Sequence, residues 1–311
     1  MLPFVAPPDA PFQTEWVAAL QAAMPGETVV PFADMDEAAR QACTVAIVAN
    51  PRPEDLRLLP NLQWVHSVWA GVERMLADLK DTDLKIVRLV DPQLATTMAE
   101  AVLAWTLYLH RDMPRYAAQQ REQRWQPLDY VRPQSKTVSL LGLGALGEAA
   151  AQRLLATGFK VQGWSRTLRA LDGVACFARD EGLAQMLAGT DILVCLLPLT
   201  PETRGLLNDA TLGQLKRSAS LINFARGAVV DDEALKCALD RGAISHAVLD
   251  VFTTEPLPAE SWHWAHAAVT VLPHVSAPTD RQTASGIVAG NIAAYRRDGT
   301  IPAYVDRKRG Y

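Results

Sequence analysis

Three side chains in the second half of the sequence combine a fixed cation, a carboxylate and a titratable ring: Arg226, Glu255 and His274. The planar guanidinium of Arg226 can bind a carboxylate and an adjacent keto oxygen through paired N–H donors. The imidazole of His274 can act as a general acid and protonate a developing alkoxide. The carboxylate of Glu255 can stabilise the imidazolium. Together these residues would suit reduction of a 2-oxo acid if a hydride donor binds beside them, although an Arg in a loop is usually a surface residue and a single His is usually not catalytic.

A glycine-rich turn supplies the expected site for that donor. Residues 138–141 form an apolar run that leads into the pattern Gly-x-Gly-x-x-Gly and then into a predicted helix. The first glycine permits a tight turn, the second lets a pyrophosphate approach the backbone, and the third lets the helix pack closely. The N–H groups of the first helical turn then face the phosphates. The predicted dinucleotide contacts are Gly142, Gly144, Ala145, Leu146 and Gly147.

The end of the next predicted strand bears on which dinucleotide binds. An NAD site usually places an acidic residue there, on the ribose 2′-hydroxyl. In this sequence Ser165, Arg166 and Thr167 follow Trp164, with no Asp or Glu among them. A guanidinium and two hydroxyls suit a 2′-phosphate, so the sequence favours NADPH. NADH stays possible, because the same segment could be an ordinary solvated loop.

The elements that must position these residues alternate strands with helices. Ligands of such folds bind at the carboxyl ends of parallel strands, where Arg226 and the glycine-rich turn are expected. Six strands are predicted in the second domain, at Thr137–Leu141, Lys160–Trp164, Ile192–Leu196, Ser220–Asn223, Ala247–Leu249 and Val269–Leu272. Their helices are predicted at Glu148–Thr157, Leu183–Ala188, Asp209–Leu215 and Asp232–Arg241.

A smaller α/β pattern precedes them, with strands predicted at Leu2–Val5, Thr28–Pro31, Val45–Val48, Leu62–His66 and Lys85–Leu89. A long helix from Thr96 to about Gln123 would cross into the second domain, and a last helix, Arg281–Asp298, would cross back. The sequence therefore predicts two Rossmann-like domains with doubly wound parallel sheets and an active-site cleft between them. Residues 1–95, completed by 279–311, would form the substrate-binding (catalytic) domain, and residues 96–278 the dinucleotide-binding domain.

Composition narrows the class of protein. The 311 residues are 49% hydrophobic and 21% charged, as in a globular protein, and the formal net charge of −4 favours neither nucleic-acid nor membrane binding. No apolar run reaches the roughly 18 residues of a membrane span. Four widely spaced cysteines without a Cys-x-x-Cys pair suggest reduced thiols. We therefore expect a cytoplasmic protein.

Several stretches resemble signatures of the D-2-hydroxyacid dehydrogenase family, over essentially the whole chain. They are Leu196–Thr203, Ala225–Asp231 and Leu249–Phe252. The order of glycine-rich turn, Arg, Glu and His is also that of the family. Within the family the chain is most similar to the glyoxylate/hydroxypyruvate reductase A type. The narrower match rests on Trp125–Leu128, Trp164–Thr167 and the tail Val305–Tyr311.

The resemblance implies NADPH-dependent reduction of glyoxylate and hydroxypyruvate to glycolate and D-glycerate, with His274 as the general acid, Arg226 and Glu255 as its catalytic partners, and no metal. Backbone N–H groups at Ala70, Gly71 and Val72 would hold the substrate carboxylate. Asp250 would bind the nicotinamide carboxamide. The family also implies a homodimer. Further cofactor contacts implied by the resemblance are Leu197, Pro198 and Ala225.

Some alternatives stay open at this point. Trp69 directly precedes the Ala70–Gly71 turn, and its indole could either face the substrate and limit its size or pack beneath the turn. Two histidines lie in the run Trp262, His263, Trp264 and His266, where loop packing is favoured over a metal site. The enzyme could instead reduce a bulkier 2-oxo acid. A non-catalytic nucleotide-sensing protein could also use the same scaffold, since a fold does not fix a function.

Overall fold

The structure, a computed structural model, describes residues 1–307, and the chain divides into two compact units. The discontinuous unit comprises Met1–Gln93 together with the chain from Thr279 onward, and the central unit comprises Leu94–Pro278. Part of the predicted tail signature, residues 308–311, lies outside the described residues. Among residues 1–307, no helix is long and apolar enough to span a membrane.

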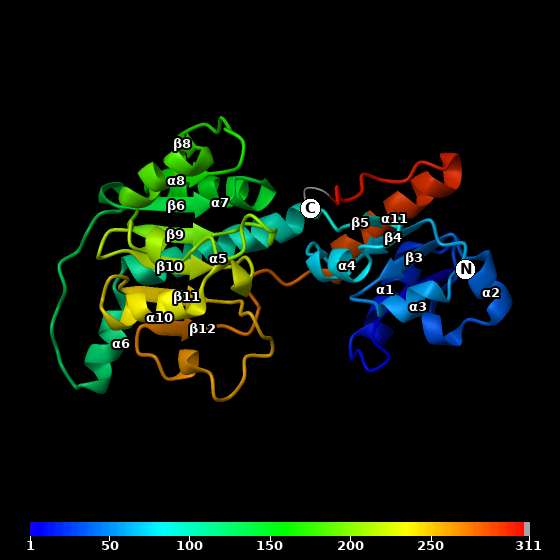
Figure 1. Ribbon diagram of the computed structural model, residues 1–311, viewed down its shortest axis with the longest axis horizontal. Coiled ribbons are helices and arrows are strands. Elements are labelled where there is room, and N and C mark those ends of the chain that lie inside the picture. The colour runs from blue at the N-terminus through cyan, green and yellow to red at the C-terminus, as the bar shows by residue number, and fades with distance from the viewer. Residues whose placement is uncertain (308–311) are drawn as a thin grey trace. The chain divides into compact units, whose positions relative to one another are not determined.

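The discontinuous unit is built on a parallel sheet of five strands in the order β2-β1-β3-β4-β5. Three of these strands, β3, β4 and β5, are labelled in Figure 1. The strands are β1 (Leu2–Val5), β2 (Val29–Pro31), β3 (Val45–Val48), β4 (Trp64–Ser67) and β5 (Lys85–Val87). The helices are α1 (Gln13–Ala23), α2 (Glu37–Ala42), α3 (Pro53–Arg57), α4 (Glu73–Asp78) and α11 (Arg281–Asp298). The short helix α2 was not predicted, although Asp36 caps it by accepting the N–H of Ala39 at 2.8 Å.

Helices cover both faces of this sheet. In β3, Val45 and Ile47 pack in the cluster that contains residues of α1 and α11. Ala46 and Val48 belong to the opposite cluster, to which α3 and α4 contribute. Because both faces are buried, the strands read as continuous apolar runs rather than as alternating patterns.

The central unit contains a parallel sheet of seven strands in the order β12-β11-β10-β9-β6-β7-β8 (Figure 1). Its strands are β6 (Thr137–Leu141), β7 (Lys160–Trp164), β8 (Val174–Phe177), β9 (Ile192–Cys195), β10 (Ser220–Asn223), β11 (His246–Leu249) and β12 (Val269–Val271). The prediction of an α/β fold with two parallel sheets is confirmed. The prediction of six strands was wrong, because the edge strand β8 is short, only partly buried, and contains Ala175, which has a weak strand preference.

Two layers of helices enclose this sheet. Helices α8 (Arg179–Ala188), α9 (Asp209–Leu212) and α10 (Asp232–Asp240) pack in one cluster of buried side chains. Helices α5 (Pro92–His110) and α7 (Ala145–Ala156) pack in the other. The sheet is therefore doubly wound, and its strand ends are left as the positions where loops can carry functional groups.

The long helix predicted from Thr96 to Gln123 is two helices. Helix α5 ends at His110, and α6 (Met113–Arg121) begins after Asp112, whose backbone is left-handed with φ of 56°. The break follows from Pro114, since proline lacks the N–H that a continuing helix would need but is tolerated in a first turn.

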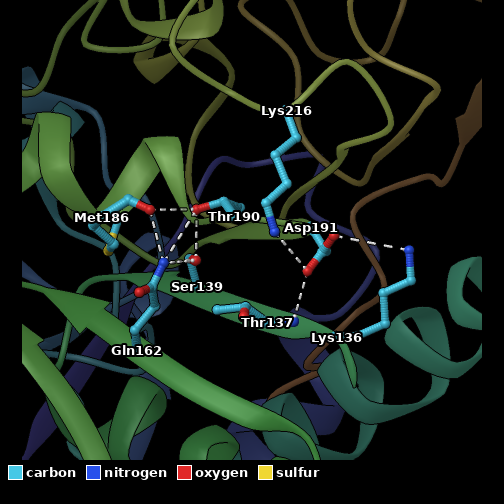
Figure 2. Close-up of polar contacts among 8 residues, drawn as sticks. All are labelled: Lys136, Thr137, Ser139, Gln162, Met186, Thr190, Asp191 and Lys216. Carbon is cyan, nitrogen blue, oxygen red and sulfur yellow. Dashed lines mark hydrogen bonds and ion pairs between the residues drawn. The ribbon is translucent and has the colours of Figure 1, made fainter. Parts of the chain in front are cut away.

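Ionic contacts hold together the amino-terminal edge of the central sheet. Asp191, directly before β9, accepts the backbone N–H of Thr137 at 2.8 Å and pairs with Lys216 at 3.1 Å and Lys136 at 3.8 Å. Figure 2 shows the Asp191 carboxylate between the two lysine side chains. The polar groups at this edge are thus satisfied by contacts within the protein. A ligand site is therefore to be sought at the opposite, carboxyl-terminal edge of the sheet.

A second polar network lies close to the first and joins two strands to a helix (Figure 2). The side-chain amide of Gln162 in β7 donates to the hydroxyl of Ser139 in β6 at 2.8 Å and to the carbonyl of Met186 in α8 at 2.7 Å. Thr190 donates to the same carbonyl at 2.8 Å. Because buried polar groups are costly without partners, these bonds fix the registration of α8 on the sheet.

Candidate active site

The carboxyl-terminal ends of the central strands lie in register along one edge. Leu141 of β6 pairs with Trp164 and with Cys195, and Asn223 of β10 pairs with Cys195 and Leu249. Leu249 in turn pairs with the last residue of β12. The loops that follow these strands therefore share this edge. They carry Gly142, Ser165, Leu197, Arg226, Asp250 and His274.

The glycine-rich turn has the geometry expected of a phosphate cradle. Gly142 has φ of 105°, and a Cβ there would lie 3.0 Å from the carbonyl oxygen of Leu196. A Cβ on Gly147 would overlap the carbonyl oxygen of Gly142, so only glycine lets α7 approach the turn this closely. A Cβ on Gly144, the N-cap of α7, would meet nothing within 4 Å. The turn is thus tight on the protein side and open at the helix N-terminus.

The loop after β7 carries the residues predicted to select the cofactor. Ser165 is tied down: its N–H donates to Phe177 at 3.1 Å, and its hydroxyl donates to the carbonyl of Thr167 at 2.8 Å. Arg166 and Thr167 are exposed. A hydrogen bond with Thr200 is the main cause that lowers the pKa of Glu202, and the charge of Arg166 contributes. Glu202, which sequence reasoning did not single out, therefore lies within electrostatic reach of Arg166.

The loop that bears Arg226 is shaped by a buried asparagine that sequence reasoning also missed. The side chain of Asn223 accepts the N–H of Ala225 at 3.2 Å and donates to the carbonyl of Arg226 at 3.1 Å. The guanidinium of Arg226 donates to the carbonyl of Ala225 at 2.6 Å. A Cβ on Gly227 would overlap the backbone of Phe252, so the Arg226 loop packs directly against the segment after β11.

His274 and Glu255 form the hydrogen-bonded pair that the sequence predicted as acid and partner. Nδ1 of His274 lies 2.8 Å from Oε2 of Glu255, and Oε1 of Glu255 accepts the N–H of Phe252 at 2.8 Å. The histidine side chain is 54% exposed and the glutamate 35%. Because an ionised carboxylate only accepts, Nδ1 carries a hydrogen and Nε2 is the ring atom left for a substrate.

Asp250 lies at the end of β11 and contacts the loop of His274. Its two carboxylate oxygens accept the backbone N–H groups of Val275 at 2.7 Å and Ser276 at 2.9 Å. The residue is only 2% exposed. The central unit thus brings Arg226, Asp250, Glu255 and His274 to neighbouring loops of one sheet edge.

The remaining predicted residues, Trp69, Ala70 and Gly71, belong to the discontinuous unit, in the turn after β4. The indole of Trp69 meets the rings of Phe12 and Trp16 edge to face, with centroids 5.8 Å and 5.5 Å away. This is the packing orientation of the two left open by the sequence. Ala70 and Gly71 are half-buried. A groove of about 540 Å³ in the same unit is lined by other residues, among them Leu59, Lys85 and Ile301.

The aromatic and histidine run near β12 is held by packing. His263 stacks on Trp262 with ring centroids 3.9 Å apart and contacts Ser261 through Nδ1 at 2.7 Å. His266 lies 3.2 Å from Asp240. Within residues 1–307, no group of three or more His, Cys, Asp or Glu side chains is placed to hold a metal ion.

Comparison with known proteins identifies related sequences over the whole length. Residues 103–276 match the family described as D-isomer specific 2-hydroxyacid dehydrogenase, NAD binding domain. A curated relative, glyoxylate/hydroxypyruvate reductase A of Serratia proteamaculans, is 37% identical over 303 residues, which cover 96% of each chain.

Solved structures agree with this relationship. A D-isomer specific 2-hydroxyacid dehydrogenase from Xanthobacter autotrophicus, in complex with NADPH and MES, is 40% identical, with a TM-score of 0.92 over 99% of both chains. An NADPH-dependent glyoxylate/hydroxypyruvate reductase from Sinorhizobium meliloti, in complex with NADP and sulfate, is 36% identical, with a TM-score of 0.91 over 100% of both chains. The resemblance found in the sequence signatures is confirmed.

Proposed function

This chain belongs to the D-isomer specific 2-hydroxyacid dehydrogenase family, and from that premise we propose that it reduces glyoxylate and hydroxypyruvate with NADPH. The products are glycolate and D-glycerate. It is an NAD(P)-dependent oxidoreductase. The observation that carries the proposal is the 2.8 Å hydrogen bond between His274 and Glu255, in loops that share a sheet edge with the loop of Arg226.

The residues at the carboxyl edge fit a dinucleotide. The open helix N-terminus at Gly144 would receive the pyrophosphate, because free N–H groups and the helix dipole favour anions. Arg166, with the hydroxyls beside it, would bind the 2′-phosphate of NADPH. When bound, NADPH supplies the hydride that adds to the carbonyl carbon of the substrate. NADH would bind without the contact to the 2′-phosphate.

The protein's own side chains perform the rest of the chemistry. Arg226 binds the substrate carboxylate and polarises the keto oxygen, so it stabilises the charge that develops there. His274, as the imidazolium, donates its Nε2 proton to the carbonyl oxygen and becomes neutral. Glu255 holds the ring by Nδ1 and stabilises its charged form.

Two other functions compete with this proposal. A reductase of bulkier 2-oxo acids would use the same residues, and the packed indole of Trp69 gives no argument for a small substrate. A non-catalytic nucleotide sensor would need the cradle but no general acid. The ordered pair of His274 and Glu255, half-exposed at the sheet edge, favours an enzyme.

We also propose a cytoplasmic homodimer. Support for a second copy comes from α6 and the segment after it, where Trp125 is 100% exposed and Tyr130 65% exposed. Exposed aromatic side chains within one short segment are typical of interaction surfaces. A cytoplasmic location is supported by the four cysteines, all within the described residues, because all of them are free thiols and none forms a disulfide bond.

The decisive experiment follows NADPH oxidation with glyoxylate, hydroxypyruvate and phenylpyruvate. Glyoxylate and hydroxypyruvate should be reduced, and His274→Ala should lower kcat by about 10²–10⁴-fold while NADPH still binds. A preference for phenylpyruvate would favour the bulkier-substrate enzyme. NADPH binding without turnover of any 2-oxo acid would favour the sensor.

A further inference from the structure

We propose that Asp250 is a positioning residue for His274, holding the backbone on which the general acid is carried. The inference rests on the proposed function, because it needs His274 to act as the acid. Its basis is that both oxygens of one buried carboxylate are bound by the N–H groups of the two residues that follow His274.

The carboxylate is fixed on the sheet and aimed at the loop. The N–H of Asp250 donates to the carbonyl of Asn223 at 3.1 Å, which continues the β10–β11 pairing by one residue. Its Oδ1 and Oδ2 then accept Val275 at 2.7 Å and Ser276 at 2.9 Å. Hydrogen bonds to an ionised group are roughly twice as strong as neutral ones, and at 2% exposure water offers little competition.

His274 needs such an anchor because of its backbone conformation. Its φ of 55° lies in the left-handed region, which non-glycine residues adopt rarely and only when their surroundings hold them there. The two bonds to Asp250 begin at the next residue. They therefore restrain the chain where it would otherwise relax to a common conformation and turn the ring away.

The segment after β11 thus controls His274 at two levels. Glu255 holds the imidazole through Nδ1 and is itself placed by the N–H of Phe252. Asp250 holds the backbone. The Glu255 side chain is 35% exposed, so it could move together with a displaced His274 ring and would not by itself hold the ring in place. Asp250 is buried and fixed to the sheet, so it cannot move in this way. Proton transfer is sensitive to displacements of this kind, because the donor must meet the carbonyl oxygen closely.

A double-mutant cycle separates positioning from a direct contact between Asp250 and the cofactor. Asp250→Asn keeps the size but turns one acceptor into an NH₂ group that faces an N–H donor. At saturating NADPH, it should lower kcat for glyoxylate by about 10- to 100-fold, part of the contribution of a general acid. In the His274→Ala background, the same change should cost less than about threefold, because the acid to be positioned is gone.

Equal losses in the two backgrounds would overturn the inference, as would a weakened NADPH dissociation constant that accounts for the whole loss. Asp250→Glu keeps the charge but displaces it, and should show the same dependence on His274, so it serves if Asp250→Asn does not fold. Asp36→Asn is the matched control, since Asp36 also accepts one backbone N–H, at 2.8 Å in the discontinuous unit, and it should leave kcat unchanged.

Hydrogen exchange tests the two hydrogen bonds from Val275 and Ser276 to Asp250 independently of enzyme activity. At least one of the amides of Val275 and Ser276 should lose protection in Asp250→Asn, and both should keep it in Glu255→Gln. Protection retained at both amides in Asp250→Asn would overturn the inference. A parent protein that reduces no 2-oxo acid would reject the proposed function, and with it the role of Asp250 toward an acid, whatever the exchange of these two amides shows.

Discussion

The Nε2 atom of His66 lies 2.8 Å from the side-chain amide nitrogen of Asn291, so a strand and a helix from opposite ends of the chain share a hydrogen bond. Nδ1 of the same ring lies 2.9 Å from the carbonyl of Ser67 and must donate to it. Nε2 therefore accepts from Asn291, and the ring is neutral. Burial lowers the pKa of His66 to about 4, in agreement with this arrangement.

The free energy of unfolding should therefore decrease as the pH is lowered from about 6.5 to about 4. In this range the unfolded chain binds a proton at His66, whereas the folded protein does not, so acid favours unfolding. About 2.5 pKa units correspond to about 3 kcal/mol. His246, whose pKa burial also lowers to about 4, adds a similar effect in the central unit.

Urea unfolding at several pH values between 7.5 and 4.5 measures this dependence. His66→Gln removes one titrating group and should make the loss of stability with acid shallower. If the His66→Gln slope equals that of the parent, the neutral buried ring is not the origin of the acid sensitivity.

Replacing Glu255 by Gln should move the alkaline limb of the kcat/KM profile to lower pH. The neutral amide can still contact Nδ1 of His274 but no longer stabilises the imidazolium, so the active protonated form is lost earlier as the pH rises. The profile is measured with glyoxylate at saturating NADPH. An unshifted alkaline limb would show that the pair does not govern protonation of the acid.

Arg166→Ala should remove most of the preference for NADPH over NADH. A charge-assisted hydrogen bond contributes about 1.5–3 kcal/mol, which corresponds to a roughly ten- to hundred-fold change in relative kcat/KM. Arg169→Ala is the control, because Arg169 is paired with Glu148 at 3.5 Å and should matter less. A parent that uses both cofactors equally well would contradict the role given to Arg166.

Trp69→Ala should lower thermal stability and reduce the activity with glyoxylate and phenylpyruvate to a similar extent. The partly buried indole packs edge to face on Phe12 and Trp16, so its removal takes away these aromatic contacts, each of which contributes about 0.5–1.5 kcal/mol. Melting temperature and kcat/KM for both substrates are the measurements. A selective gain for phenylpyruvate would instead assign Trp69 to substrate selection.

Residue types and spacing were sufficient to predict that Arg226 and His274 lie in loops at one sheet edge, because parallel strands bring the loops after them together. The positions of Arg226 and His274 follow from strand ends that local sequence reveals, whereas Glu255 lies further along the loop after β11. The bracing of the Arg226 loop by Asn223 could not be foreseen, since it depends on how one side chain turns back on its own loop. The orientation of Trp69 likewise depends on α1, more than fifty residues away.

Other differences had local causes that the sequence does contain. The break between α5 and α6 could have been placed at Pro114, which ends one helix and suits the first turn of the next. The cap at Asp36 marks the start of α2. The strand β8 is harder to find, because an edge strand with incomplete burial needs no continuous apolar run.

The packing of α11 against α1 has a consequence for the order of synthesis. Trp16 and Leu20 are buried with Ala284, Val288 and Ile292, which the ribosome makes last. At about 5–20 residues per second, residues 94–278 take about 10–40 s to emerge, and through that time the first segment lacks its covering helix. During translation the nascent chain therefore passes through a stage in which the central unit can already be folded while one apolar face of the first sheet is still exposed. This exposed face is a binding site for chaperones until α11 has been synthesised.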